Sequence, residues 1–264
     1  MSDEPVFRRE GEAFVPTGHA RGPWDPASQH GGAPAALLAE AVQADGMHVA
    51  RLTYDFLGPV PLQPLRVNTR IVRPGRRLQL VEAELLAGDT PVMRAQATRL
   101  RRADVRLPAA ADAEAVPGGG PAAGASSPFP GEAQDAEGFH RTAMEIRFVG
   151  GTGYGKGPAL AWFRFARPLV DAEAPSPWAL VAAAADFGNG VSRILDFDEH
   201  LFVNTDLSIH LQREPVGEWV MLEARTRVEP HGTGLATSRL YDERGPIGVS
   251  AQSLFVAERD VSAR

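Results

Sequence analysis

The chain aligns with itself when it is shifted by 156 residues, and this internal repeat restricts the possible fold more than any other feature of the sequence. The shift places Pro59 on Pro215 and Gln96 on Gln252, and the alanines before both glutamines also coincide. A chain of 264 residues has room for one large domain or two small ones. We therefore predict two halves that are built in the same way.

The segment between the two halves differs from both in composition. Residues 104–138 are rich in Ala, Pro and Gly and contain almost no large apolar side chains. Such a segment buries too little surface to offset the entropy that ordering costs. We therefore predict an N-terminal domain over residues 1–103, a linker over 104–138 and a C-terminal domain over 139–264.

Each half is predicted to contain short antiparallel strands and one helix. The helices begin at Pro34 and at Ser176-Pro177, where proline suits the first turn and serine the N-cap. Extended runs bounded by glycine turns cover residues 65–86, 92–101, 218–228, 235–241 and 247–256. The second helix is apolar on every face, so it must be covered on most sides. The pattern indicates an α+β fold, with one curled antiparallel sheet around each helix.

Composition excludes several classes of protein and of site. The chain has no cysteine, which excludes disulfides, zinc-thiolate sites and cysteine nucleophiles. Its net charge of −6 comes without a long basic run, which argues against nucleic acid as the partner. No apolar run approaches the roughly 18 residues of a membrane span, and the first residues lack the pattern of a signal peptide. We expect a soluble, cytoplasmic protein with neither a metal nor a cofactor.

Short motifs in both halves, in this order, resemble one enzyme family. They are Gly22-Pro23-Trp24-Asp25-Pro26, Gln29-His30-Gly31-Gly32, Asp55-Phe56-Leu57-Gly58-Pro59-Val60-Pro61, Arg73-Pro74-Gly75-Arg76-Arg77, Ala185-Asp186-Phe187-Gly188-Asn189-Gly190, Asn204-Thr205-Asp206-Leu207, Tyr241-Asp242-Glu243-Arg244-Gly245 and Ser250-Ala251-Gln252. The set is similar to the double-hotdog acyl-CoA thioesterases, in particular the bacterial type II acyl-CoA thioesterase-like group of lipid metabolism. The resemblance implies a tandem (double) hotdog with two curled antiparallel sheets, and hydrolysis of an acyl-CoA thioester.

The resemblance further implies a catalytic water that an Asp, a Thr or Ser, and a Gln hold in the second hotdog. Asp206 and Gln252 match the Asp and the Gln, although Asp206 also suits a solvated strand face. Ungapped alignment from the downstream Gly234 places the hydroxyl position on Arg227, one residue past Thr226. Strand alternation places Thr226 on the apolar face of its strand, so Thr226 is the preferred candidate. Packing alone also explains a β-branched residue there.

The start of the first helix is the predicted site for the thioester oxyanion. Helix N-termini have unpaired amides, and Gly31 and Gly32, which follow His30, allow a ligand to approach the backbone. A simple turn is the competing interpretation. A second predicted contact is the arginine turn of Arg73, Arg76 and Arg77, which suits the phosphates of CoA unless it is merely a solvated turn.

Two other functions remain open at this point. Asp25 and His30 resemble the dyad of hotdog enoyl-CoA hydratases, although the residues between them lack the Asn-Pro of that pattern. A hotdog protein can also bind acyl-CoA without turning it over.

The internal repeat also predicts how many sites each chain has. Shifting the candidate triad back by 156 residues gives Ala50, Arg70 and Gln96, so the first half lacks a base and a hydroxyl. We expect one site per chain, to which the first half lends its helix start. We also expect a homo-oligomer, a dimer of double hotdogs, because hotdog sheets commonly pair through exposed strands.

Overall fold

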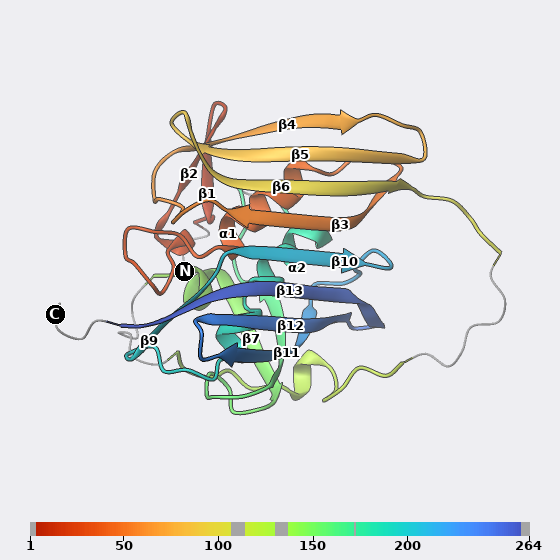
Figure 1. Cartoon of the computed structure of the whole chain (residues 1–264). Helices are drawn as coiled ribbons and strands as arrows, with labels where there is room; N and C mark the ends of the chain where they lie inside the picture. The colour runs from red at the N-terminus through yellow and green to blue at the C-terminus, as the bar shows by residue number, and fades with distance from the viewer. Residues whose placement is uncertain (1–3, 107–113, 130–136, 172, 260–264) are drawn as a thin grey trace.

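The computed structural model describes residues 4–106, 114–129, 137–171 and 173–259. Its main feature is a single antiparallel sheet of 13 strands, in the order β1-β2-β4-β5-β6-β3-β10-β13-β12-β11-β8-β7, with β9 paired to β13 (Figure 1). The strands are β1 (Phe7–Glu10), β2 (Ala13–Pro16), β3 (Met47–Phe56), β4 (Leu65–Arg73), β5 (Leu78–Ala87), β6 (Thr90–Arg101), β7 (Met144–Gly150), β8 (Ala159–Phe165), β9 (His200–Asn204), β10 (Asp206–Leu211), β11 (Val220–Glu229), β12 (Thr233–Asp242) and β13 (Gly245–Glu258).

The predicted α+β class is confirmed, but the prediction of two separate sheets is wrong. Strand β3 of the first half pairs with β10 of the second, with Leu52 opposite Ile209 and Thr53 opposite Ser208. This pairing joins the strands of both halves into one sheet. The physical reason is that two open edges with matching registers satisfy their backbone groups by pairing with each other.

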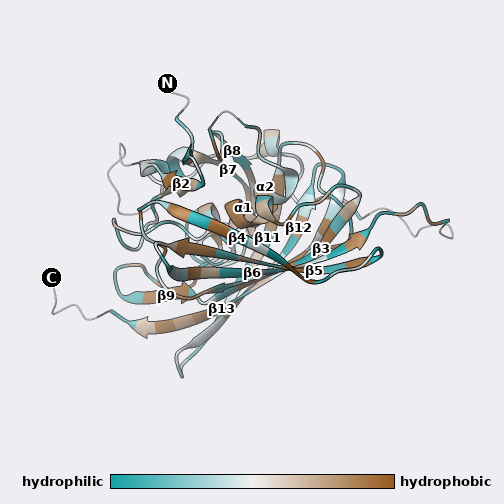
Figure 2. Cartoon of the chain, turned by 90° about the horizontal axis from the view of Figure 1, so that it is seen from above, coloured by the Kyte–Doolittle hydropathy of each residue, from teal (hydrophilic) through white to brown (hydrophobic). Residues whose placement is uncertain are grey.

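Two helices lie side by side within the curve of this sheet, α1 (Gly32–Ala41) and α2 (Pro177–Ala185) (Figure 2). Both were predicted, and α2 begins as expected, with the Ser176 hydroxyl accepting a hydrogen bond from the Ala179 amide at 3.2 Å. The shorter helical turns are α3 (Gly188–Val191), η1 (Gly18–Ala20), η2 (Pro121–Ala123) and η3 (Phe139–Ala143). None of the helices among the described residues is long and apolar enough to cross a membrane.

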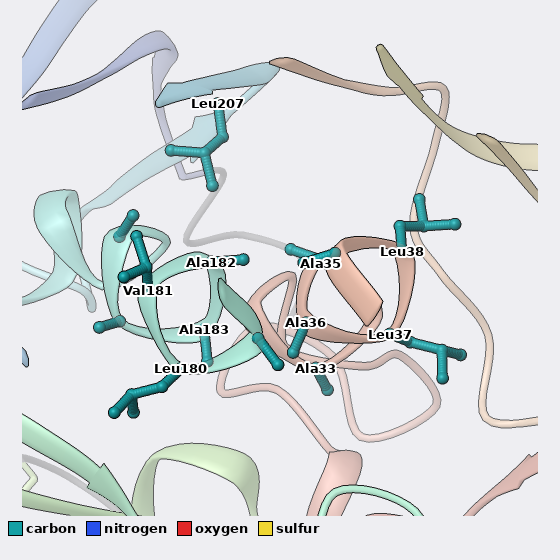
Figure 3. Close-up of a cluster of buried hydrophobic side chains, with 14 of the residues drawn as sticks. Ala33, Ala35, Ala36, Leu37, Leu38, Leu180, Val181, Ala182, Ala183 and Leu207 are labelled. Carbon is teal, nitrogen blue, oxygen red and sulfur yellow. The ribbon is translucent and has the colours of Figure 1, made fainter. Parts of the chain in front are cut away.

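Alanines allow α1 and α2 to pack closely. Ala35 and Ala36 of α1 face Ala182 and Ala183 of α2 in the buried core, and Leu207 points at the helix pair from strand β10 (Figure 3). The two helices run antiparallel, because Gly32 at the start of α1 approaches the Ala183 carbonyl near the end of α2. The start of α1 and the end of α2 therefore meet at one end of the helix pair.

The internal repeat is present in the sheet, but its spacing there is 155 residues. The β5–β6 and β12–β13 hairpins carry a bulge at the same place, with Leu85 opposite Met93 in one and Leu240 opposite Gly248 in the other. This spacing places Ala97 at the position of Gln252. Gln96, which a spacing of 156 matches with Gln252, is exposed, whereas Gln252 is buried.

Part of the segment predicted as a linker is packed against the second half. Within residues 114–129, the Gly119 carbonyl accepts a hydrogen bond from the Trp162 indole at 2.9 Å, and Ala125 forms a bridge with Phe148 of β7. Val116 packs against the cluster of Trp162, Trp219, Met221 and Tyr241. Composition does not reveal this order, because the apolar surface that the segment covers belongs to distant strands. Residues 107–113 and 130–136 lie outside the described residues.

Candidate active site

A buried carboxylate lies where α2 ends and α1 begins. Asp186 directly follows α2, and its side chain is only 4% exposed. His30 and Gly31 precede α1 at the same end of the helix pair, and His30 Nδ1 lies 3.0 Å from Asp186 Oδ2. A Cβ atom on Gly31 would lie 2.9 Å from Asp186 Oδ2 and 2.8 Å from the Phe56 ring. Glycine at position 31 therefore lets the helix start touch the carboxylate.

Two side-chain amides hold the other oxygen of Asp186. Asn204 Nδ2, at the end of β9, donates to Asp186 Oδ1 at 2.9 Å. Gln252 Nε2 on β13 donates to the Asp186 backbone carbonyl at 3.2 Å and lies 3.5 Å from Oδ1. Gln252 Oε1 in turn accepts from the Asn189 amide at 3.1 Å. The carboxylate is therefore fixed by strands and helices of the second half and by the helix start of the first.

His30 Nδ1 has two hydrogen-bond partners, and the presence or absence of a proton on this nitrogen determines which of them it binds. This nitrogen is also 3.0 Å from the Gly32 amide, which donates only to an unprotonated nitrogen. The Asp186 carboxylate, in contrast, accepts only from a protonated nitrogen. Phe187 stacks on the imidazole with ring centroids 4.4 Å apart and 30° between the planes, which fixes the ring orientation. Asp186 Oδ2 and the Gly32 amide therefore compete for one imidazole nitrogen, His30 Nδ1.

The buried Tyr54 lies close enough to Asp186 for the carboxylate charge to affect the pKa of its hydroxyl. The Tyr54 hydroxyl donates to the Ala35 carbonyl of α1 at 2.9 Å. Burial, and secondly the negative charge of Asp186, raise the pKa of Tyr54 well above its ordinary value of 10.0. Tyr54 therefore stays protonated and serves as a hydrogen-bond donor rather than as a base.

A cavity of about 480 Å³ opens over Asp186, and residues of both halves line it. Its polar lining includes His30, Asp186, Asn189 and Asn204, which gather around the carboxylate. The large apolar side chains of the remaining wall are mostly aromatic, and these rings are Trp24, Phe56, Phe129, Tyr154, Phe187 and Phe197. A hollow with an apolar wall and a small polar cluster suits a small-molecule substrate.

The structure does not bring Asp206, Thr226 and Gln252 together. Asp206 is on the outer face of the sheet, where its Oδ1 accepts from the Ser253 amide at 2.9 Å. Its neighbour Leu207 points inward at the helices (Figure 3), and successive side chains of a strand point to opposite faces. Gln252 is buried on the inner face, so the sheet separates the two side chains.

Thr226 is buried on the inner face, as strand alternation predicts. Its hydroxyl is 2.8 Å from the Ser192 hydroxyl, which donates to the Gly188 carbonyl at 2.7 Å. These contacts hold α3, whose Asn189 amide binds Gln252. Thr226 thus supports the element behind the carboxylate and makes no hydrogen bond to it among those of the described residues.

The predicted helix start lies at the carboxylate, whereas the arginine turn lies far from it. Arg73, Arg76 and Arg77 surround a separate hollow with Arg101, which pairs with Met47 at the beginning of β3. The cavity over Asp186 lies beyond Phe56 at the other end of β3, about 30 Å away at ~3.4 Å per residue. In Figure 1 the β4–β5 turn is on the right, and the end of β3 is on the left.

Asp25 and His30 do not form a dyad. Asp25 closes its own turn, with its carboxylate accepting from the Ala27 amide and the Ser28 hydroxyl, both at 2.9 Å. The Ala27 amide first, and then the Ser28 hydroxyl, lower the pKa of Asp25. The carboxylate partner of His30 is Asp186 instead.

Sequence reasoning missed Asp186 and Asn204 as site residues, although both lie in the motifs that carry the family resemblance. One signal was available: an acidic residue directly after a wholly apolar helix must lie at the end of the core. Among the described residues, the one cluster spaced to hold a metal ion is Glu4, His19 and Glu137, and none of these lines the cavity.

Comparison with known proteins identifies the family. The acyl-CoA thioesterase C-terminal domain matches residues 108–256, and the acyl-CoA thioesterase N-terminal domain matches residues 20–100. The chain therefore belongs to the acyl-CoA thioesterase family and is a thioester hydrolase, as the motifs predicted. None of the curated proteins compared with the chain matches it.

Solved structures agree on the fold. A conserved protein with a hot dog fold from Alicyclobacillus acidocaldarius has a TM-score of 0.70 at 16% identity, covering 95% of each chain. The tesB protein of Mycobacterium avium subsp. paratuberculosis has a TM-score of 0.64 at 16% identity, covering 95% of this chain and 96% of its own. Acyl-CoA thioesterase II TesB2 from Mycobacterium marinum has a TM-score of 0.63 at 13% identity, covering 86% and 88%. At these identities the likeness shows a hot dog fold.

Proposed function

We propose that Asp186 activates a water that hydrolyses an acyl-CoA thioester in the cavity. The observation that carries this proposal is the convergence of His30, Asn204 and Gln252 on one buried carboxylate at the cavity wall. The predicted base, Asp206, is on the other side of the sheet, so the role passes to Asp186. Asn204 takes the place proposed for the Thr226 hydroxyl, and Gln252 keeps its role.

The proposed reaction needs no covalent intermediate on the protein. Asp186 takes a proton from water as the water oxygen bonds to the thioester carbon. The carbonyl oxygen becomes an oxyanion, which the Gly31 amide and the positive end of α1 stabilise, because the Gly32 amide donates to His30 Nδ1 and Gly32 does not line the cavity. The oxyanion then reforms the carbonyl, the carbon–sulfur bond breaks, and the CoA sulfur leaves as a thiol with the proton held by Asp186.

Each half contributes differently to this site, and we propose that each corresponds to one hotdog unit. The opposite end of the helix pair, where α1 ends and α2 begins, has a carboxylate in Glu40. That carboxylate accepts from the Ser176 amide at 2.5 Å and is therefore occupied in capping α2. This supports one active site per chain. We further propose that two such chains form a homodimer, which light scattering on the purified protein measures.

Release of free CoA thiol from acyl-CoA by the purified chain tests the proposal. Asp186→Asn keeps the shape but removes the proton acceptor, so we expect kcat/KM to fall by about 10²- to 10⁴-fold. Asp206→Asn is the matched control and should change kcat/KM by less than about threefold, because its carboxylate is outside the cavity. A loss in Asp206→Asn with full activity in Asp186→Asn would overturn the assignment. Binding of acyl-CoA without thiol release would indicate a binding protein.

A further inference from the structure

We propose that the acyl group of the substrate carries an aromatic ring. This inference rests on the proposed function for the position of the thioester next to Asp186. Six of the 24 residues that line the cavity are Phe, Trp or Tyr, whereas these residues make up 7% of the chain. Only three lining residues, Val60, Leu201 and Val203, have branched aliphatic side chains. Among the large apolar side chains of the wall, aromatic rings therefore outnumber branched aliphatic side chains by six to three.

The rings are tilted against one another and do not stack flat. Phe129 and Tyr154 have centroids 5.0 Å apart and planes at 71°. Phe129 and Phe197 are 5.3 Å apart at 46°, and Trp24 and Phe197 are 5.1 Å apart at 54°. Aromatic rings prefer edge-to-face or offset contacts at 4.5 to 7 Å. A wall that presents both edges and faces offers such contacts to a further ring, whereas a straight alkyl chain gains only from burial.

Other residues hold these rings in place from outside the cavity. Phe202 packs edge-on against Trp24, with centroids 5.0 Å apart and planes at 89°. The Arg193 guanidinium lies 4.8 Å from the centroid of Phe197, and the Arg259 guanidinium lies 5.6 Å from that of Trp24. Four of the rings come from four separate segments of the chain: Trp24, Phe129, Tyr154 and Phe197. Phe129 belongs to the segment between the halves. The ring wall is thus preorganised, which lowers the entropy cost of binding.

The aromatic wall continues up to the carboxylate. Phe187 stacks on His30, and the Phe56 ring lies beside Gly31 at the helix start. An acyl group whose carbonyl reaches Asp186 therefore lies near the rings of Phe56 and Phe187, which both line the cavity. The cavity of about 480 Å³ is large enough for an acyl group of one or two rings.

The test compares two thioesters with eight acyl carbons each, phenylacetyl-CoA and octanoyl-CoA. We expect kcat/KM for phenylacetyl-CoA to exceed that for octanoyl-CoA by about tenfold, equivalent to about 1.4 kcal/mol. Phe197→Leu and Phe129→Leu each remove one ring at similar volume and should lower this ratio by about fivefold. The control Phe255→Leu changes a ring that is 51% exposed and does not line the cavity, so the ratio should stay the same. Thermal melting of each variant confirms that it is folded.

The outcomes separate this inference from the proposed function. Turnover of octanoyl-CoA that depends on Asp186, without a preference for phenylacetyl-CoA, would overturn the inference alone. The same holds if the leucine variants leave the ratio unchanged. If neither thioester is hydrolysed, the proposed function fails. The inference is then tested by the dissociation constants of both compounds, which quenching of tryptophan fluorescence measures. Equal or tighter binding of octanoyl-CoA would then refute it.

Discussion

Replacing Gly31 by alanine should impair catalysis more than folding. The new Cβ would lie 2.9 Å from Asp186 Oδ2 and 2.8 Å from the Phe56 ring, where ordinary contacts begin at about 3.4 Å. The carboxylate must therefore move by about 0.5 Å. Its oxygens are tied to Asn204 and His30, so the shift lengthens at least one contact that is now 2.9 or 3.0 Å long.

The size of both effects follows from this geometry. A misplacement of about 1 Å at a reacting group can cost roughly 10²-fold, so half of that distance should lower kcat/KM by about tenfold. Crowding of the core costs about 1–3 kcal/mol of unfolding free energy. The φ angle of −56° at Gly31 suits alanine. Because alanine gives the unfolded chain less conformational entropy than glycine, this part of the change stabilises the fold by about 0.4–1 kcal/mol. The net loss of stability should be about 0–2.6 kcal/mol.

The assay is thiol release on the best acyl-CoA, together with urea unfolding of the same preparations. Gly120→Ala is the matched control, because its φ is −73° and a Cβ there meets nothing within 4 Å. Its activity should equal that of the parent chain, and its stability should be higher by about 0.4–1 kcal/mol. If Gly31→Ala kept full kcat/KM, the close approach of the helix start to Asp186 would have no role in catalysis, and the reasoning would be refuted.

Two further predictions concern a strand glutamine and a buried ion pair. Gln252→Ala should lower kcat/KM by about 10- to 1,000-fold, whereas the exposed Gln96→Ala should have little effect; equal losses would mean that both halves contribute alike. Burial raises the pKa of Asp242, but hydrogen bonds from Arg213 and two backbone amides outweigh burial and hold this pKa below its ordinary value of 3.8. The ionised Asp242 therefore stabilises the folded chain above pH 3.8. This stabilisation is lost as the pH falls through the lowered pKa. Asp242→Asn should therefore cost about 2–3 kcal/mol of unfolding free energy at pH 7 and less at pH 3, and a cost independent of pH would contradict this.

The sequence alone was sufficient to predict the two helices, most of the strands and the protein family. Helix starts at Pro34 and Ser176, the strand alternation around Thr226, and the motifs in both halves are local patterns, and local patterns follow from side-chain chemistry at fixed periods. The duplication was also visible, because a repeated fold retains residues at equivalent turns. The helix start at His30, Gly31 and Gly32 was predicted as part of the site and lies at the carboxylate.

Only the tertiary structure decided which carboxylate faces the cavity. Asp206 and Asp186 both lie in motifs of the second half, and in a strand a shift of one residue moves a side chain to the other face of the sheet. The joining of both halves through β3 and β10, and the 155-residue spacing of the hairpins, depend on strand pairing over long sequence separations. The aromatic wall likewise assembles rings from segments that are far apart in the chain. Such contacts arise from packing of the whole chain, and no local pattern specifies them.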